Sequence, residues 1–150
     1  MAQSSCRLPA ALALRCSAPS RNLYLSALRM PLVTVASNVP DQKFPKDFNR
    51  QFTNVLAEAT GKPAARISLL VTPGARLTHG GTNEPTCLIT VKAIGAFSDD
   101  LNVKYSATIA DFMHKSVGIS PEKCIIQYMN LEPENVSNSG TTMKVLMSKK

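Results

Sequence analysis

In this 150-residue chain, the spacing of the cysteines and histidines indicates whether metal binding or thiol chemistry is expected. They stand at Cys6, Cys16, Cys87, Cys124, His79 and His114. No Cys-x-x-Cys pair and no zinc-type Cys/His spacing occurs, so we expect no metal site. Cys87 and Cys124 lie in apolar, strand-like runs. We expect them to be buried free thiols, which suit a reducing compartment and not a disulfide scaffold.

The apolar pattern after residue 30 predicts the elements that must position any site. Residues 31–37 are rich in Leu, Val and Thr, which predicts a strand. A helix follows, with Pro45 in its first turn and Gly61 at its C-cap. The continuous apolar run 67–72 then predicts a buried strand. The helix is indicated by six apolar residues on one face: Phe44, Phe48, Phe52, Val55, Leu56 and Ala59.

The second half of the chain repeats this plan. Residues 86–94 predict a strand, Gly118 ends a second helix, and residues 124–129 predict a second buried strand. The sequence LVTV at 32–35 is echoed by LITV at 88–91. We therefore predict an α+β fold built by tandem βαβ duplication, a four-stranded sheet with two helices on one face. The second helix carries its own apolar stripe: Leu101, Tyr105, Ile109, Phe112, Met113 and Val117.

Continuously apolar strands require cover on both faces of the sheet, and two helices cover only one. We therefore expect oligomerisation through the other face. The tail Thr141–Met147 alternates between polar and apolar residues. It is predicted to be a strand that pairs with a neighbouring subunit.

The charge distribution argues against nucleic-acid binding. The net charge is +7, but residues 1–30 contain four arginines and no acid, whereas residues 31–150 hold 13 Lys/Arg against 10 Asp/Glu. The basic excess is thus concentrated outside the predicted domain, which carries no basic cluster. Aromatic residues make up 5% of the chain, too few for a base-stacking platform. No apolar run is long enough to span a membrane.

Residues 1–30 are interpreted as an N-terminal extension, predicted to be disordered, before a domain at 31–150. Their Arg, Ser, Ala and Leu content without acids is typical of a mitochondrial transit peptide. Arg21, Leu23 and Ser26 fit two-step processing that removes Leu23–Met30 second and leaves Pro31 as the new N-terminus. Alternatively, translation begins at Met30, and the preceding residues are an upstream extension.

Six short motifs in register resemble the family of macrophage migration inhibitory factor and D-dopachrome tautomerase. The similarity covers essentially all of residues 31–150. The motifs are Met30-Pro31, Asn38-Val39-Pro40, Gly61-Lys62-Pro63, Gly80-Gly81-Thr82-Asn83-Glu84-Pro85, Ile94-Gly95 and Ile119-Ser120-Pro121-Glu122.

The resemblance implies a homotrimer with three active sites between subunits. It also implies a keto–enol tautomerase acting without a cofactor on phenylpyruvate-type or dopachrome-type substrates. Several animal members are extracellular cytokines that engage a cell-surface receptor. By this resemblance the protein is cytoplasmic and secreted without a signal peptide, or mitochondrial if residues 1–30 are a transit peptide.

By the same resemblance, Pro31 is the catalytic base and Lys62 binds the substrate carboxylate and lowers the pKa of the proline amine. Ile94 offers backbone groups to the substrate. An α-amino group titrates near pH 8, far below lysine, so it can act as a base near neutral pH. Read without the family, Pro31 simply begins an edge strand, Lys62 is a surface lysine favoured at a helix C-terminus, and Ile94 is a strand residue.

Two further substrate-binding positions depart from the family pattern. Ile125 and Gln127 stand where the family has Tyr and Asn, so we expect a more apolar pocket with altered substrate preference. The Cys-x-x-Cys of some members is absent, with Thr86 and Ile89 at its positions, so we expect no thiol–disulfide activity tied to that motif. If Met30 stays attached, Pro31 is an amide without useful basicity. The alternative function is then a non-enzymatic, cytokine-like trimer that binds a receptor.

Overall fold

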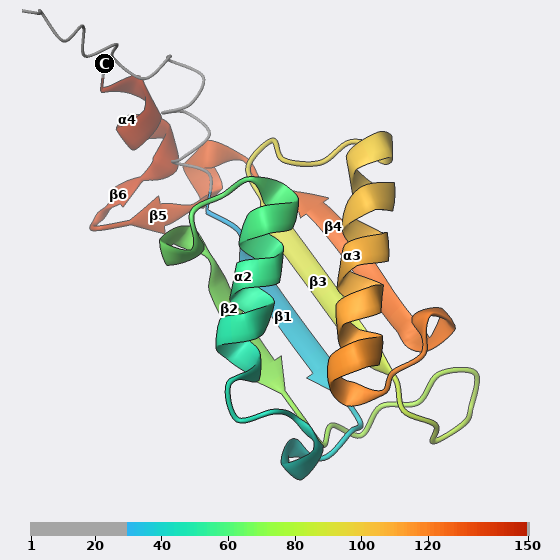
Figure 1. Cartoon of the computed structure of the whole chain (residues 1–150). Helices are drawn as coiled ribbons and strands as arrows, with labels where there is room; N and C mark the ends of the chain where they lie inside the picture. Colours follow the sequence, from blue (N-terminus) through green and yellow to red (C-terminus); the bar gives the residue numbers. More distant parts are fainter. Residues whose placement is uncertain (1–29, 150) are drawn as a thin grey trace, which may run out of the picture.

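The computed structural model describes residues 30–149, which form a sheet covered on one face by two helices (Figure 1). The sheet order is β2-β1-β3-β4. Predictions about residues 1–29, including the transit peptide and its processing, lie outside the described residues. The sheet and its helices comprise β1 (Leu32–Ser37), α2 (Phe48–Thr60), β2 (Ser68–Thr72), β3 (Cys87–Ala93), α3 (Asp99–Val117) and β4 (Cys124–Asn130).

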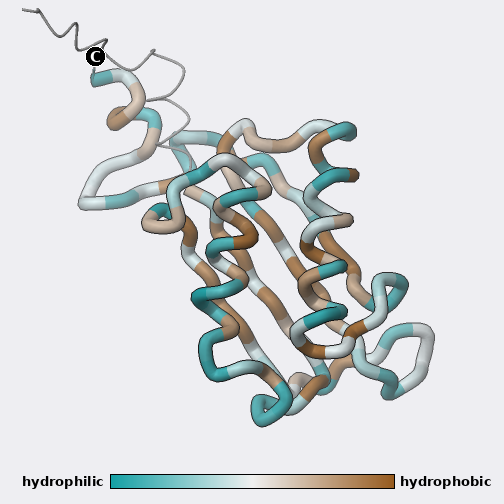
Figure 2. Tube along the Cα trace, viewed as in Figure 1, coloured by the Kyte–Doolittle hydropathy of each residue, from teal (hydrophilic) through white to brown (hydrophobic). Residues whose placement is uncertain are grey.

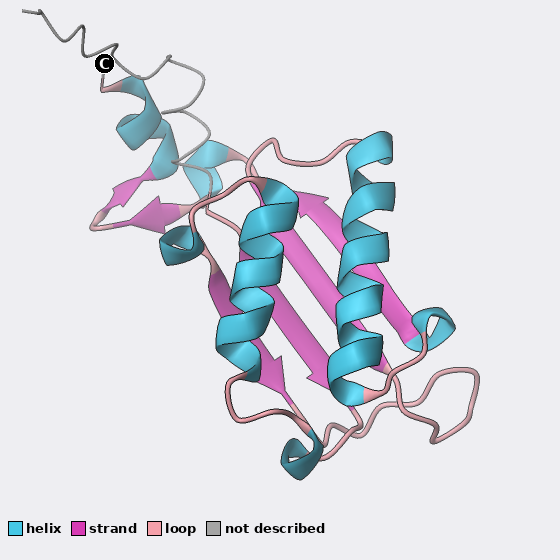
Figure 3. Cartoon of the chain, viewed as in Figure 1, coloured by secondary structure: helices cyan, strands magenta, loops and turns pink. Residues whose placement is uncertain are grey.

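The strand pairing confirms the predicted duplication. β1 pairs with β2 in parallel, and β3 pairs with β4 in parallel. Each pair is connected through one helix, which makes two βαβ units, and the units join where β1 runs antiparallel to β3. Figure 3 shows both helices lying over the same face of the sheet, as the sequence predicts.

The helix α2 begins later than predicted. A short 3-10 turn at Asp41–Lys43 precedes it, and Phe44 is extended, with ψ 136°. Pro45 therefore lies before the helix and not in its first turn. Phe44 is extended because proline disfavours the helical conformation in the residue that precedes it. Gly61 ends α2 with φ 63°, a left-handed conformation that glycine adopts without strain, as predicted.

The core fills the space between the helices and the sheet. Phe52 is fully buried and stacks on Phe112 at a ring-centroid distance of 5.2 Å, which joins α2 to α3. Ile109 and Met113 of α3 face Val33 and its neighbours on the sheet within the same buried cluster. Figure 2 shows hydrophobic segments along the strands and the helices that cover them.

The other face of the sheet carries large apolar side chains that no element of residues 30–149 covers. Both β2 and β4 are edge strands, so the predictions of buried strands at 67–72 and 124–129 are wrong for the single chain. The described helices α2 and α3 cover one face only. The exposed fractions of these side chains are 61% for Leu70, 45% for Leu88, 39% for Ile125 and 40% for Met129.

The C-terminal segment also differs from its predicted strand. Two strands of two residues each, β5 (Ser137–Asn138) and β6 (Thr141–Thr142), form a hairpin. The hairpin leads into helix α4 (Met143–Ser148). Met143, Leu146 and Met147 stand three and four residues apart, a helical spacing that overrides the alternation in this stretch. Their side chains pack against Ile94. No helix within residues 30–149 is long and apolar enough to cross a membrane.

Candidate functional site

Pro31 lies at the start of β1 and is buried, with less than 2% of its surface exposed. Its carbonyl oxygen accepts a hydrogen bond of 3.0 Å from the backbone N–H of Ser68, the first residue of β2. This bond extends the parallel pairing of the two strands by one residue. The proline is therefore held at the end of the sheet where both strands begin.

Lys62 follows the glycine that ends α2 and leads the chain toward the same end of the sheet. Its backbone N–H donates a 3.2 Å hydrogen bond to the carbonyl of Ala57. A 3-10 turn at Ala64–Arg66 then connects it to Ser68. Only 9% of Lys62 is exposed. A lysine buried to this degree is unlike the solvated residue expected at a helix C-terminus, because lysines are rarely buried unless they are paired.

Ile94 follows the last residue of β3 and is 5% exposed. Because Leu32 pairs with Lys92 in the antiparallel register, the end of β3 lies beside the start of β1. The fold thus brings Pro31, Lys62 and Ile94 to one end of the sheet, from the start of β1, the end of α2 and the end of β3.

Met30 occupies apolar surface at this end of the sheet. It packs, partly buried, against the cluster formed by Ile94, Val136 and Met143. With Met30 attached, the nitrogen of Pro31 is an amide whose lone pair is delocalised into the carbonyl of Met30, so it has no useful basicity.

The C-terminal side chains of this cluster were not among the sequence-predicted site residues. Val136 and Met143 form one buried cluster with Ile94, and Leu146 and Met147 pack against it, so α4 covers apolar surface at this end. The helical spacing of Met143, Leu146 and Met147 is the signal from which their packing on one face can be predicted.

Ile125 and Gln127 are not brought to Pro31 within one chain. β4 is separated from β1 by β3, and Ile125 pairs with Leu88 whereas Gln127 pairs with Thr90. From strand spacing and rise per residue, Ile125 lies about 19 Å and Gln127 about 14 Å from Pro31. Both residues lie on the open face and would reach a Pro31 site only from another copy of the chain.

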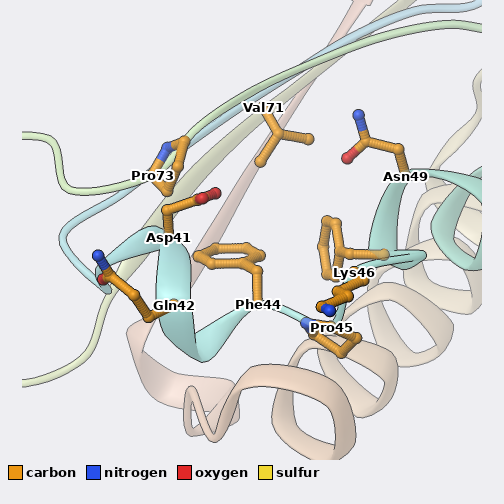
Figure 4. Close-up of a pocket in the computed structure, with 9 residues that line it drawn as sticks. Asp41, Gln42, Phe44, Pro45, Lys46, Asn49, Val71 and Pro73 are labelled. Carbon is orange, nitrogen blue, oxygen red and sulfur yellow. The ribbon is translucent and has the colours of Figure 1, made fainter.

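A cleft of about 640 Å³ lies elsewhere, near the start of α2 (Figure 4). Its walls combine the rings of Phe44 and Phe48 with the charged Asp41 and Lys46. None of the predicted site residues lines it. Among the described residues, no group of three or more His, Cys, Asp and Glu side chains could hold a metal ion.

Comparisons with known proteins agree on one family. The family model of macrophage migration inhibitory factor matches residues 30–144. The MIF-like protein mif-2 of Caenorhabditis elegans is 41% identical over 114 residues, which cover 76% of this chain and 95% of the relative. D-dopachrome decarboxylase of Gallus gallus is 30% identical over 118 residues, covering 78% of this chain and all of the relative (100%).

A solved structure confirms the fold. Macrophage migration inhibitory factor from Trichinella spiralis superposes with a TM-score of 0.71 at 24% identity, covering 74% of this chain and 98% of that one. The predicted α+β tautomerase-like fold is therefore confirmed.

Proposed function

Because the chain belongs to the macrophage migration inhibitory factor family, we propose that it is a cofactor-independent keto–enol tautomerase with the amine of an N-terminal Pro31 as general base. The neutral amine removes a proton from the carbon next to the substrate carbonyl, and a proton is delivered to the oxygen as the carbon–carbon double bond forms. The substrates are small 2-oxo or enol carboxylates of phenylpyruvate type, or dopachrome-like molecules. The name of the Gallus gallus relative supports the second class.

The observation that carries the proposal is the burial of Pro31 and Lys62 at the same end of the sheet, beside Ile94. An amine in apolar surroundings and near a cation is easier to deprotonate, because both disfavour its charged form. The Lys62 ammonium also offers a charge-assisted hydrogen bond to a substrate carboxylate. Ile94 contributes backbone groups beside an apolar wall suited to an aromatic ring.

A complete site requires further copies of the chain. We propose a homotrimer in which a neighbouring subunit supplies Ile125 and Gln127 to each Pro31. The uncovered apolar face of the sheet, where both residues lie, supports this arrangement. Ile125 provides no hydroxyl, so only Gln127 of this pair can donate a hydrogen bond from its side chain. The resulting pocket favours substrates with a large apolar group.

The packing of Met30 favours a second function for the intact chain. With Met30 against Ile94 and the nitrogen of Pro31 blocked, the 150-residue form is proposed to be a non-enzymatic, cytokine-like protein that binds a cell-surface receptor. Secretion without a signal peptide is the localisation proposed for this role. A cytoplasmic or mitochondrial form that begins at Pro31 is proposed to be the enzyme.

The test compares three proteins: the full chain, a chain beginning at Pro31, and the latter with Pro31→Gly. Intact mass verifies each N-terminus, and enol–keto conversion of phenylpyruvate is followed by absorbance. Only the chain beginning at Pro31 is expected to be fully active, and Pro31→Gly is expected to lose about 100-fold or more in kcat/KM. Equal rates for the full chain and the chain beginning at Pro31 would refute the role of the amine.

A second test probes Lys62 in the chain that begins at Pro31. Lys62→Ala removes a cation, so the proline amine keeps its proton to higher pH and the acidic limb of the rate profile moves up by about 1 pH unit. KM for a carboxylate substrate rises as well. Arg66→Ala, which removes a nearby but less buried cation, serves as the control. It is expected to leave the acidic limb of the rate profile and KM unchanged. A Lys62→Ala profile identical to that of the parent chain would contradict the assignment.

A further inference from the structure

Two thiols face each other at the starts of the parallel strands β3 and β4. Cys87 and Cys124 are register partners, and the Cys87 thiol donates a hydrogen bond of 3.4 Å to Sγ of Cys124. Cys87 is completely buried, whereas 8% of Cys124 is exposed. Neither residue is part of the proposed tautomerase site.

The geometry of this pair suits a covalent bond. Neighbouring strands lie about 4.8 Å apart, inside the range of about 4.4–6.8 Å between the Cα atoms of disulfide-bonded cysteines. Register partners point to the same face of the sheet, so the two side chains already share one orientation. A disulfide bond is about 2.05 Å long, so the sulfurs, now 3.4 Å apart, need to approach by about 1.4 Å.

Hydrogen bonds hold the backbone on either side of the thiols. Thr86 directly precedes Cys87, and Lys123 directly precedes Cys124. The Thr86 hydroxyl donates a hydrogen bond of 2.8 Å to the backbone carbonyl of Lys123. The Ser37 hydroxyl donates to the carbonyl of Thr86 at 2.9 Å. These bonds tie the last residue of β1 to the residues that directly precede β3 and β4. The pair is therefore preorganised, and bond formation requires no change of register.

The two thiols also differ in reactivity. The hydrogen bond from Cys87 lowers the pKa of the Cys124 thiol because it stabilises the thiolate. The same hydrogen bond, together with burial, raises the pKa of the Cys87 thiol. Cys124 is thus both the more exposed and the more readily ionised member, and a small oxidant reaches it first.

We propose that Cys87 and Cys124 form an oxidation-sensitive modification site that hydrogen peroxide converts into an intramolecular disulfide joining β3 to β4. The Cys124 sulfur attacks the peroxide, the O–O bond breaks, and a sulfenic acid and one molecule of water form. The Cys87 sulfur then attacks the sulfenic sulfur, its S–O bond breaks, and a second water leaves. The two thiols lose two electrons, which the peroxide takes up. This proposal is independent of the role of Pro31.

The bond has a measurable mechanical consequence. It closes a loop between residues 37 positions apart and fastens an edge strand to the interior of the sheet. Loop closure restricts the unfolded chain, so the oxidised protein is expected to melt several degrees higher, and at most about 15 °C higher, than the reduced one.

The experiment treats the reduced full chain with hydrogen peroxide, alkylates the remaining thiols after unfolding, and maps the peptides by mass spectrometry. The expected result is a cross-linked peptide pair containing Cys87 and Cys124, lighter than the reduced pair by about 2 Da, that dithiothreitol releases. The control is a chain with Cys6→Ser and Cys16→Ser, which keeps the cross-link and the higher melting temperature. Cys124→Val fills the same apolar space and is expected to lose both the cross-link and the higher melting temperature.

The peptide map of the wild-type chain decides the outcome even if a variant fails to fold. Separate alkylation of Cys87 and Cys124, after a peroxide dose that has oxidised Cys6 and Cys16, would overturn the proposal. So would oxidation of Cys124 to the sulfinic acid without a cross-link, or a cross-link from Cys124 to Cys6 or Cys16.

Discussion

The uncovered face of the sheet leads to a quantitative prediction about assembly. Leu88 lies on this face, near the start of the interior strand β3, and is 45% exposed in the single chain. Complete burial of a leucine side chain contributes about 2 kcal/mol, so covering this exposed part contributes about 1 kcal/mol per copy. Replacing Leu88 with glutamate removes that gain and adds the cost of desolvating a carboxylate, which is at least about 3 kcal/mol.

The two terms sum to about 4 kcal/mol per copy, which corresponds to a weakening of association by about a thousandfold. If the chain forms the proposed trimer, Leu88→Glu is therefore expected to be monomeric at concentrations where the parent chain is assembled. Sedimentation equilibrium over a concentration series measures the shift directly.

A matched control separates burial in the assembly from a general effect of the added charge. Val103 lies on α3 and is 70% exposed, more than Leu88, but it is on a helix and not on the open sheet face. Val103→Glu is expected to leave the association constant unchanged. The reasoning is refuted if Leu88→Glu assembles as tightly as the parent chain, or if both variants dissociate equally.

Three further predictions concern the folded chain itself. Phe52→Ala removes a fully buried ring stacked on Phe112 and is expected to lower the free energy of unfolding by about 3–5 kcal/mol, measured by urea denaturation. The ammonium of Lys123, 2.9 Å from Glu84, lowers the pKa of that carboxyl from its ordinary value of 4.5, and NMR titration of Lys123→Ala is expected to show it rising back. That ion pair stabilises the fold at neutral pH, and its contribution is lost as pH falls through the lowered pKa. Gly118→Ala forces a side chain into φ 78° at the end of α3 and is expected to cost about 1 kcal/mol, seen as a lower melting temperature.

The sequence predicts well which segments form helices and strands along the chain, because these elements depend on local spacing. The stripes around Phe52 and Ile109 repeat at helical intervals, and Gly61 and Gly118 mark the ends of α2 and α3. The start of α2 is mispredicted because the extended Phe44 before Pro45 interrupts a stripe that is otherwise continuous. The spacing of apolar residues indicates which side chains contact the core, not which of them are helical. Phe44 packs against Phe48 although it lies outside the helix.

Burial of the edge strands and the short C-terminal helix are harder to predict. The hydropathy of Leu70 and Ile125 predicts that these side chains lie in apolar surroundings. It does not predict whether the same chain or another copy of it supplies those surroundings. A six-residue helix such as α4 is unstable on its own, so its packing on Ile94 decides its structure. Its sequence fits both an alternating strand and a helical stripe.

The candidate site shows the same division between local and long-range information. A proline at the start of a strand is common, so Pro31 gains significance only through its neighbours in the sheet. The burial of Lys62 depends on how the turn after α2 returns the chain to β2, which no short stretch of sequence encodes. The distances from Ile125 and Gln127 to Pro31 likewise follow from the strand order and the pairing register, which are long-range features.

The position of α4 beside Met30 and Ile94 determines where a label or fusion partner can be attached. An extension before Pro31 blocks the amine on which the proposed tautomerase activity depends, and an affinity tag after α4 follows the helix that packs in this cluster, so either fusion is expected to disturb the proposed site. The exposed loop containing Gly80 and Gly81 lies at the opposite end of the sheet (Figure 1), and a Cβ built on either glycine would have no atom within 4 Å, although their positive φ angles favour keeping both glycines. An epitope or dye inserted there would report on the protein while leaving both ends of the chain native.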